Sequence, residues 1–306
     1  MIIRKFNQFL SKRRERKHLA QCAALLETPP LVPQDDGLVI FSMIGTRVVL
    51  PYLLAVKSLH RQLQRGRAII LDDGSLTPAD KALLAAQLGN PQIIPIASVE
   101  TGDCPNGGCW ERLFTLLALR DVDYVIQLDS DTVTIGSVPE VAEAVAANRS
   151  FTLSGGETEA PLGSLPLPEF AQRFYPEGEE GGHIQSTFES RILQLPDATS
   201  KRYARGCAGF AGFAKGGGGI KAAHAFSRDA QAIVGDRWSE WGSEQIASNY
   251  LIANEEGATL LPYARYFNYW NSPWGGDMRF IHFVGAWRYA NDSYAKATDR
   301  AINLLR

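Results

Sequence analysis

Long uncharged hydrophobic runs are missing from this sequence of 306 residues, and so is a strong excess of charge of either sign. A helix that crosses a membrane needs about 20 consecutive apolar residues, so we expect neither a transmembrane helix nor a signal peptide, and we expect a cytoplasmic protein. The net charge is −2, although residues 1–17 carry seven Lys and Arg against one Glu. The rest of the chain is therefore mildly acidic, which argues against nucleic acid as a partner.

Cysteine is also scarce, and the chain has only Cys22, Cys104, Cys109 and Cys207. The segment CPNGGC, which contains Cys104 and Cys109, could close as a small disulfide or offer two thiolates to a metal. A structural zinc site needs four ligands, and no second Cys or His pair lies nearby in the sequence. Without an export signal we expect the thiols to be reduced.

Residues 1–35 form a basic amphipathic N-terminal segment. Its apolar residues recur at helical spacing, with basic residues between and after them; they are Ile2, Ile3, Phe6, Phe9 and Leu10. This pattern is typical of a helix on an anionic membrane surface, so residues 1–17 could make a peripheral membrane contact. The alternative is a solvated helix that packs on the body of the protein, because basic amphipathic stretches are common.

Apolar runs alternate with helical patterns over the next 100 residues. Short apolar runs predict strands, which are expected at 38–43, 67–71 and 92–96 and from residue 124. Helical patterns lie between them, at 48–63, 78–88 and 110–120. This alternation predicts an α/β fold with a Rossmann-like, mostly parallel central sheet flanked by helices. Downstream, residues 154–186 are rich in Gly, Pro and Glu and predict an irregular loop.

Two acidic clusters follow strands of this predicted sheet. The segment YVIQLDSDTVTIG places Asp129 and Asp131 directly after an apolar run, and Asp73 follows the run at 67–71. Open parallel sheets bind ligands at the carboxyl ends of their strands. Paired carboxylates at such an end suit Mg²⁺ or Mn²⁺, which leave positions open for phosphate oxygens. The pair therefore predicts an anchor for a nucleoside diphosphate, although an Asp-x-Asp sequence also occurs by chance.

A haloacid dehalogenase-like phosphatase is an alternative interpretation of LDSDTVT. In that family the first Asp, here Asp129, is the nucleophile, and the second, here Asp131, is a general acid. The motif usually lies on the first strand, however, and three strands are predicted before it here. The later acidic pair that would hold Mg²⁺ is also not evident downstream.

Several short segments together resemble GT-A-fold glycosyltransferases, and most closely the family-8 retaining type, which includes glycogenin-like and galactosyltransferase-like enzymes. LDSDT resembles the Asp-x-Asp metal motif of that family. SEQIASN, residues 243–249, resembles its Asp-Gln-Asp-x-Leu-Asn segment, with Ile246 in place of the second Asp. HFVGAWR, residues 282–288, resembles its His-Phe-x-Gly-x-x-Lys segment, although Tyr289-Ala290 stands where Pro-Trp usually follows.

The resemblance implies a metal site made by Asp129, Asp131 and His282. The histidine would be the third ligand, through a neutral imidazole. For a histidine on an apolar strand, the alternative is an ordinary core residue. The metal would be Mn²⁺ or Mg²⁺, and the donor would be a nucleoside-diphosphate sugar, with a UDP-sugar favoured.

Other residues receive roles by the same resemblance. Gly285 would let the backbone approach the diphosphate, and Arg288 would neutralise it as it leaves. Glu244 and Gln245 would be the catalytic residues near the anomeric carbon. Position in the chain suggests two further contacts, of Asp73 with the nucleoside and of Arg112 with the diphosphate or sugar. A turn residue and a surface charge are the alternatives for these two.

The resemblance thus implies one GT-A-like catalytic domain at 36–290, with a C-terminal region on the acceptor side and a C-terminal helix at 291–306. The expected activity is metal-dependent transfer of a sugar to a glycan or lipid-linked acceptor with retention of configuration. A pseudoenzyme that only binds nucleotide sugars is a further alternative. A nucleotidyltransferase would need a Gly-rich phosphate loop near the first strand. SMIGTR is a weak candidate for such a loop.

Overall fold

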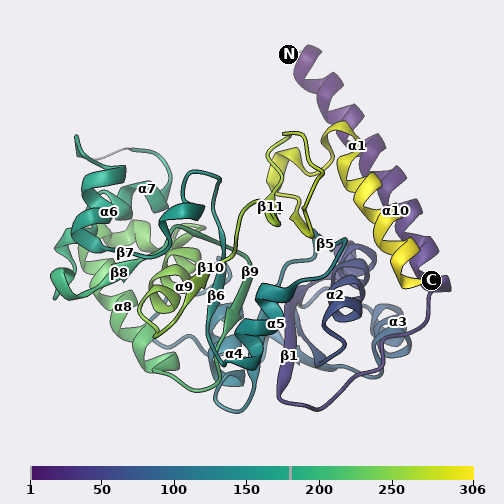
Figure 1. Ribbon diagram of the computed structural model, residues 1–306, viewed down its shortest axis with the longest axis horizontal. Coiled ribbons are helices and arrows are strands. Elements are labelled where there is room, and N and C mark those ends of the chain that lie inside the picture. The colour runs from purple at the N-terminus through teal and green to yellow at the C-terminus, as the bar shows by residue number, and fades with distance from the viewer. Residues whose placement is uncertain (1, 179–180) are drawn as a thin grey trace. The chain divides into compact units, whose positions relative to one another are not determined.

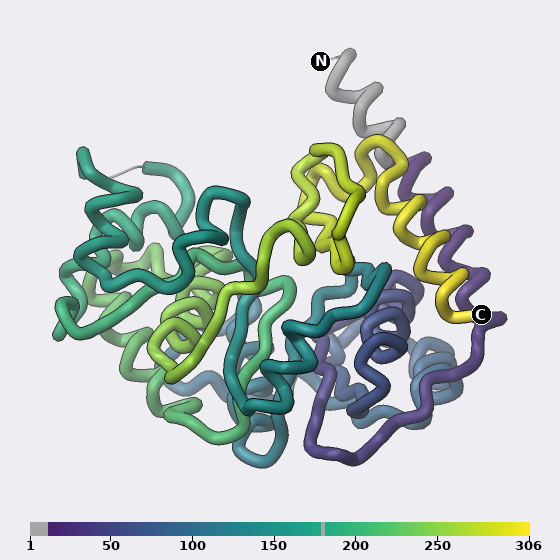
Figure 2. The backbone as a smooth tube through the Cα atoms, viewed as in Figure 1, coloured from purple at the N-terminus to yellow at the C-terminus, as the bar shows by residue number. Residues whose placement is uncertain are grey.

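The computed structural model describes residues 2–178 and 181–306, and for residues 2–11 it describes the backbone only. The chain forms two compact units, built from three and two stretches of sequence, and the course of the chain can be followed in Figure 2. Unit 1 contains Met1–Pro95, Leu128–Ala142 and Tyr263–Arg306. Unit 2 contains Ile96–Gln127 and Glu143–Pro262.

A seven-stranded sheet with the strand order β10-β6-β9-β4-β1-β2-β3 is the centre of the fold. Its strands are β1 (Leu38–Ile44), β2 (Arg67–Asp72), β3 (Gln92–Pro95), β4 (Tyr124–Leu128), β6 (Phe151–Ser154), β9 (Gly206–Phe213) and β10 (Thr259–Leu260). β2 pairs in parallel with both β1 and β3, and β10 pairs in parallel with β6, whereas β9 runs antiparallel to β6. The predicted α/β class and mostly parallel sheet are confirmed, and β3 lies at the edge, where Pro95 is tolerated.

Unit 1 adds a small three-stranded sheet and two helices to this framework. The small sheet has the order β11-β12-β5 and consists of β5 (Thr132–Thr134), β11 (Tyr266–Asn268) and β12 (Phe280–His282). The helices are α2 (Val49–Leu63) and α3 (Pro78–Leu88). Thr77 and Asp80 form a capping box at the start of α3, which explains why this helix begins where Thr-Pro predicted it.

The two terminal helices of unit 1 lie side by side, as Figures 1 and 2 show for α1 (Ile2–Cys22) and α10 (Ser293–Leu305). Gln21 Nε2 donates to the carbonyl oxygen of Ala295 at 3.1 Å, and Lys17 forms an exposed ion pair with Asp292 at 3.7 Å. Residues 12–22 of α1 thus pack on the body of the protein. The predicted membrane contact concerns the apolar side chains of residues 2–10, which lie outside the described side chains.

His18 is a buried polar residue between these helices and has 1% of its surface exposed. The Thr298 hydroxyl donates to the carbonyl oxygen of Tyr294, so it accepts from Nε2 of His18 at 3.0 Å. Burial, assisted by the nearby charge of Arg288, lowers the pKa of His18 to about 4. The folded protein therefore holds this imidazole in its neutral form.

The free energy of unfolding is expected to depend on pH through His18. Between pH 6.5 and 4 the unfolded chain binds a proton that the folded chain does not, so stability falls as the pH is lowered through this window. The loss due to His18 is at most about 3 kcal/mol and levels off below pH 4. In urea unfolding at about pH 7.5 and about pH 4.5, His18→Gln should show a smaller pH difference than wild type. An equal difference in both proteins would contradict this.

Unit 2 contains three longer helices and several short elements. The longer helices are α4 (Trp110–Leu119), α8 (Gly219–Val234) and α9 (Ser243–Ala253). The short elements within unit 2 are β7 (Leu165–Pro166), α6 (Leu167–Phe174), α7 (Ile184–Glu189) and β8 (Arg202–Tyr203), and α5 (Pro139–Ala146) connects residues of the two units along the chain.

The expectation of an irregular loop at 154–186 was wrong in part. Leu167, Phe170 and Ala171 are buried on one face of α6 and stabilise a helix there despite the Gly and Pro around it.

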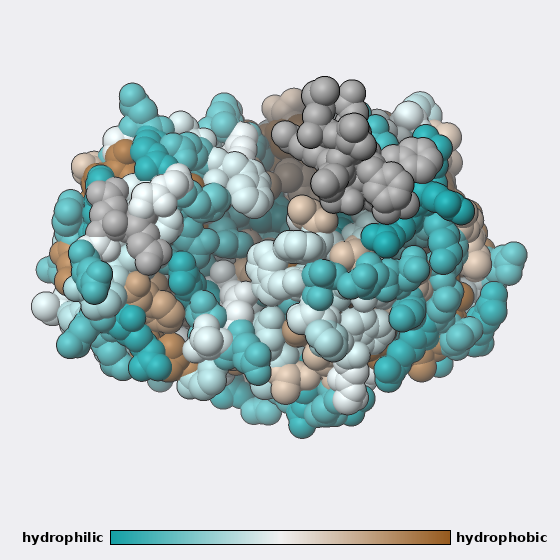
Figure 3. All heavy atoms as spheres, turned by 90° about the horizontal axis from the view of Figure 1, so that it is seen from above, coloured by the Kyte–Doolittle hydropathy of each residue, from teal (hydrophilic) through white to brown (hydrophobic). Residues whose placement is uncertain are grey.

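Hydrophobic side chains outside the core are scattered. The exposed large ones include Val32, Val122, Trp241, Trp270 and Trp287. On the face of the molecule in Figure 3, teal hydrophilic residues predominate and brown residues occur in small groups. Scattered exposure of this kind is normal for a protein surface and needs no binding partner to explain it. Among the described residues, no helix is both long and apolar enough to cross a membrane.

Candidate metal and nucleotide site

The chain turns sharply after β4, and this turn brings Asp129 and Asp131 to one place. β4 ends at Leu128 and β5 begins at Thr132, so both aspartates lie in the short connection between two strands. β5 pairs antiparallel with β12, with Thr132 opposite His282. The backbone N–H of Phe283 donates to the carbonyl oxygen of Asp131 at 2.9 Å. Strand pairing thus places His282 beside an aspartate about 150 residues earlier in the chain.

The three side chains converge. One ligand atom from each of Asp129, Asp131 and His282 lies within 4.8 Å of the other two. His282 Nε2 lies 3.3 Å from Asp131 Oδ1. Asp131 and His282 are buried, whereas Asp129 is half-buried. Two carboxylates and an imidazole, buried on one side and open on the other, form a donor set that can hold a divalent cation.

Asn268 on β11 orients the histidine. β11 pairs in parallel with β12 and places Asn268 opposite His282, and the distance from Asn268 Oδ1 to His282 Nδ1 is 2.9 Å. With Nδ1 donating to this oxygen, Nε2 is the nitrogen that faces Asp131. Histidines that bind metals usually have such a partner on the other ring nitrogen. Sequence reasoning missed Asn268, because only the β11–β12 pairing reveals its position within an aromatic stretch.

Arg288 also contacts Asp131. Its guanidinium donates to Asp131 Oδ2, and its Nε donates to the carbonyl oxygen of Phe283 at 3.2 Å. Burial raises the pKa of Asp131, but His282 and Arg288 outweigh this effect, and the pKa lies below its usual value. Gly285 precedes Arg288 in a short 3-10 helix, is exposed and has φ +45°, a conformation that favours glycine. The structure therefore brings Arg288 to the predicted metal ligands.

The two aspartates at the end of β2, Asp72 in its last position and Asp73 directly after it, differ in their roles. Asp72 is buried and accepts from Gly74 N, Leu76 N and Lys81 Nζ at 2.9, 3.2 and 2.8 Å, so it holds the turn together. Asp73 is exposed, and its carboxylate accepts from the backbone N–H and the hydroxyl of Ser75. A Cβ at position 45 would lie 2.1 Å from Asp73 Oδ2, so only Gly45 leaves room for this carboxylate.

Glu244 and Arg112, which were predicted to contact the donor, form an ion pair with each other in unit 2. Arg112 Nη2 lies 3.0 Å from Glu244 Oε2, and the two side chains are only 8% and 3% exposed. The indole N–H of Trp110 donates to Ser243 Oγ at 2.9 Å and joins the same two helices, α4 and α9. Both charges are therefore used to hold the start of α9 in place, a role that sequence reasoning did not foresee.

Gln245 follows on α9 and belongs to a polar network in unit 2. Its Oε1 accepts from Ala208 N at 3.1 Å, and its Nε2 donates to Gln185 Oε1 at 3.1 Å. Gln185 donates in turn to Glu189 at 2.7 Å, and Arg205 pairs with Glu189 at 3.1 Å. Burial raises the pKa of Glu189 in spite of this arginine. Sequence reasoning missed Gln185 and Glu189, which lie in or beside the stretch it took for an irregular loop, and Arg205, which lies between β8 and β9.

This chain is similar to known proteins in its structure. No protein-family model matches the chain, and no curated protein sequence does. Among solved structures, the galactosyltransferase LgtC with donor and acceptor sugar analogues is 15% identical, with 86% of this chain and 95% of that chain covered and a TM-score of 0.48. GlyE from Streptococcus pneumoniae is 12% identical, with 87% and 63% covered and a TM-score of 0.46. Mouse xyloside xylosyltransferase 1 is 11% identical, with 82% and 98% covered and a TM-score of 0.41.

All three proteins are glycosyltransferases, the class that the resemblance of LDSDT, SEQIASN and HFVGAWR implies. Similarity at these identities does not transfer an activity from one protein to another. The function of this chain must therefore be inferred from the side chains of its own site.

Proposed function

We propose that this protein is a glycosyltransferase that transfers a sugar from a nucleoside-diphosphate sugar to a carbohydrate or lipid-linked acceptor, with a divalent cation held by Asp129, Asp131 and His282. One observation carries the proposal. Two carboxylates at the end of a strand meet an imidazole from far along the chain, and Asn268 fixes the orientation of that imidazole. A core histidine would not need two acidic partners beside it.

The donor set fits Mn²⁺ or Mg²⁺. Carboxylate oxygens suit both ions, and an imidazole nitrogen favours Mn²⁺ of the two. Three protein ligands leave positions for the oxygens of a diphosphate. When bound, the cation would supply positive charge to the leaving diphosphate.

The other residues of unit 1 are assigned to the donor. Arg288 would pair with a diphosphate oxygen in place of Asp131 Oδ2, since a guanidinium can bind phosphate with two parallel hydrogen bonds. Gly285 is exposed and has no Cβ to keep a phosphate away from its backbone. Asp73 is exposed at the end of β2 and would accept from a hydroxyl or base N–H of the nucleoside. The resemblance favours UDP.

Gln245 and Glu244 are assigned different tasks, the first at the sugar and the second in positioning α9. Glu244 is held by Arg112, so its task is to position the start of α9. Gln245 is half-buried and has a neutral amide that can face a developing positive charge without a competing ion pair. We therefore assign Gln245 to the sugar near the anomeric carbon, and the resemblance favours retention of configuration.

A phosphatase that uses Asp129 as its nucleophile is less well supported. Its general acid would be Asp131, which here lies 3.3 Å from Nε2 of His282 and accepts from Arg288. A carboxylate that is paired with a cationic guanidinium is a poor proton donor. A pseudoenzyme would have the same donor site, and only turnover separates it from an enzyme.

Thermal unfolding with ligands tests the proposal. We expect Mn²⁺ to raise Tm, and we expect UDP or another nucleoside diphosphate to raise it further only when Mn²⁺ is present. A ligand at about 100 times its Kd stabilises the fold by about 2.7 kcal/mol. Release of the nucleoside diphosphate from a panel of nucleotide sugars should accompany binding. Binding without release would indicate a pseudoenzyme, and phosphate release from simple monoesters without nucleotide binding would indicate the phosphatase.

Asn268 provides a smaller, separate prediction. Asn268→Ala removes the acceptor that orients His282, so the Kd for Mn²⁺ should rise about 10- to 100-fold. Asn268→Asp keeps an oxygen at the same place and should bind Mn²⁺ nearly as well as wild type. Isothermal titration with Mn²⁺ measures both variants. Equal affinity in Asn268→Ala and wild type would show that this contact does not support the metal site.

A further inference from the structure

A cavity in unit 2 belongs to none of the groups described above. It has a volume of about 400 Å³, within the range of about 300–1,000 Å³ that is usual for small-molecule sites. The lining residues come from the end of α4, the first three turns of α8, the second half of α9 and the segment before β8. α9 carries Gln245 near its start and contributes Asn254, which caps its end, to the cavity. These two positions are about 13 Å apart along the helix axis.

An aromatic pair forms part of the cavity wall. Tyr250 stacks on Phe226 with ring centroids 4.1 Å apart and an interplanar angle of 15°. Phe226 is 3% exposed and is packed from behind by Phe188 and Trp238, so it is a rigid support. Tyr250 is only half-buried, and Phe226 covers one of its faces. Its remaining surface is a flat apolar platform with a hydroxyl at the edge.

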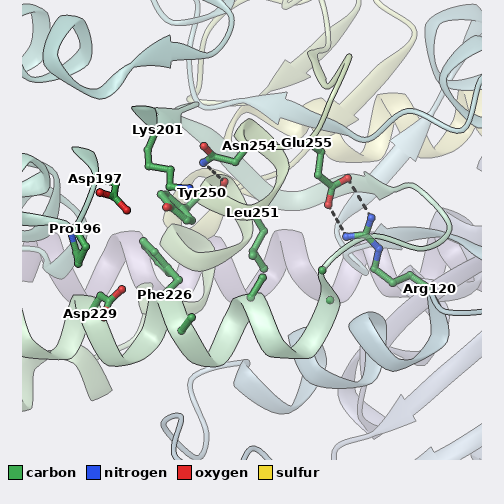
Figure 4. Close-up of a pocket in the computed structure, with 14 residues that line it drawn as sticks. Arg120, Pro196, Asp197, Lys201, Phe226, Asp229, Tyr250, Leu251, Asn254 and Glu255 are labelled. Atoms are coloured by element: carbon green, nitrogen blue, oxygen red, sulfur yellow. Dashed lines mark hydrogen bonds and ion pairs between the residues drawn. The ribbon is translucent and has the colours of Figure 1, made fainter. Parts of the chain in front are cut away.

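Carboxylate, ammonium and amide groups surround this platform. Asp197 and Asp229 lie beside the Tyr250–Phe226 pair in Figure 4, and Lys201 and Asn254 also line the cavity. Burial raises the pKa of Tyr250, and the charges of Asp229 and Asp197 raise it further, which places both acids within electrostatic reach of the phenol. Asp229 also contacts the exposed Arg228 at 3.7 Å.

The charge balance selects a neutral ligand. The glycine run that precedes α8 would by itself favour an anion at the N-terminus of that helix. Arg120 is committed elsewhere, because it pairs with Glu255 at 2.5 and 3.1 Å (Figure 4) and donates to the carbonyl oxygen of Ala214 at 2.8 Å. The other charged residues that line the cavity are one positive side chain, Lys201, and two negative ones, Asp197 and Asp229. Such a surface attracts hydroxyl groups and repels phosphate.

We infer that this cavity binds a neutral saccharide. A flat aromatic platform accepts the apolar face of a sugar ring, while the carboxylates of Asp197 and Asp229 accept hydrogen bonds from its hydroxyls and the ammonium group of Lys201 donates to them. The inference does not depend on the proposed transfer activity, because it concerns binding at residues that take no part in the metal or nucleotide site. For an enzyme that acts on glycans, a second sugar-binding site would hold a part of the acceptor chain away from the reacting end.

Saturation-transfer NMR with a panel of neutral di- and trisaccharides of gluco, galacto and manno configuration tests this inference, with inorganic phosphate as the anionic probe. We expect millimolar binding of at least one saccharide. Tyr250→Leu should weaken it roughly tenfold, and Asp229→Asn should weaken it too. Tyr250→Phe keeps the stacked ring and should retain most of the affinity.

Asp131→Asn separates this inference from the proposed function, because it should lose Mn²⁺ binding and keep the saccharide binding. The inference is overturned if no saccharide of the panel binds, if phosphate binds at this cavity instead, or if Tyr250→Leu binds as well as Tyr250→Phe. A comparison of Tm for the two Tyr250 variants shows whether a loss of affinity comes from a loss of folding.

Discussion

Replacing Asp131 with Asn is expected to lower kcat/KM for sugar transfer by about 10³-fold or more. Asp131 is the residue on which the candidate site depends most, because it offers a ligand oxygen, faces Nε2 of His282 and accepts from Arg288. An amide has the same shape as a carboxylate. It lacks the negative charge that attracts the cation, His282 and Arg288 to this position. The variant should lose the metal and, with it, the diphosphate.

The fold of Asp131→Asn should survive with a modest loss of stability. Arg288 would keep its bond to the carbonyl oxygen of Phe283 and has a third of its side chain exposed, so water can replace part of the lost ion pair. We therefore expect Mn²⁺ to raise Tm in wild type and to leave Tm unchanged in the variant. Nucleoside diphosphate release with and without Mn²⁺, followed by chelation with EDTA, measures the effect on activity.

Asp35→Asn is the matched control. Asp35 is in the same unit, is 87% exposed and pairs with Arg67 at 3.5 Å. An exposed pair of this kind contributes little to stability, so this variant should behave like wild type in every assay. If Asp131→Asn retained activity within about tenfold of wild type, or still gained Tm from Mn²⁺, the metal site would have to be built from other residues.

Local sequence signals were sufficient for most of the parallel strands and for the acids at their ends. β1, β2 and β3 are short apolar runs bounded by turn residues, and Thr77-Pro78 marks the start of α3. The Asp129–Asp131 pair could be located because the ends of parallel strands lie on one edge of a sheet. The convergence of His282 on this pair was expected only from the resemblance, since 151 residues separate it from Asp131.

The supporting residues could not be found from sequence because they depend on pairings between distant segments. Asn268 meets His282 only through the parallel register of β11 and β12. Arg112 meets Glu244 because α4 and α9 pack against each other, and nothing in WERLFTLLALR distinguishes this arginine from a surface charge. α6 is a helix of eight residues in a stretch rich in Pro and Gly, where local propensity is outweighed by burial of one apolar face.

Breaking the ion pair of Arg112 and Glu244 should cost more stability than replacing either His18 or Asp131. The side chains of the pair are 8% and 3% exposed, so removal of one partner leaves the other charge buried and poorly compensated. Arg112→Leu and Glu244→Leu should each lower the free energy of unfolding by about 3–5 kcal/mol. The double variant should lose much less than the sum, because it leaves neither charge behind.

A double-mutant cycle in urea measures this coupling, and the pair Arg149–Glu143 is its control. That pair has a similar separation of 2.7 Å, but its side chains are 37% and 72% exposed, so its coupling should stay below about 1 kcal/mol. If the two buried substitutions were additive, each residue would act independently, and Glu244 would be available to the substrate as the sequence resemblance implied. Strong coupling would instead make Glu244 a positioning residue and leave Gln245 as the group that faces the sugar.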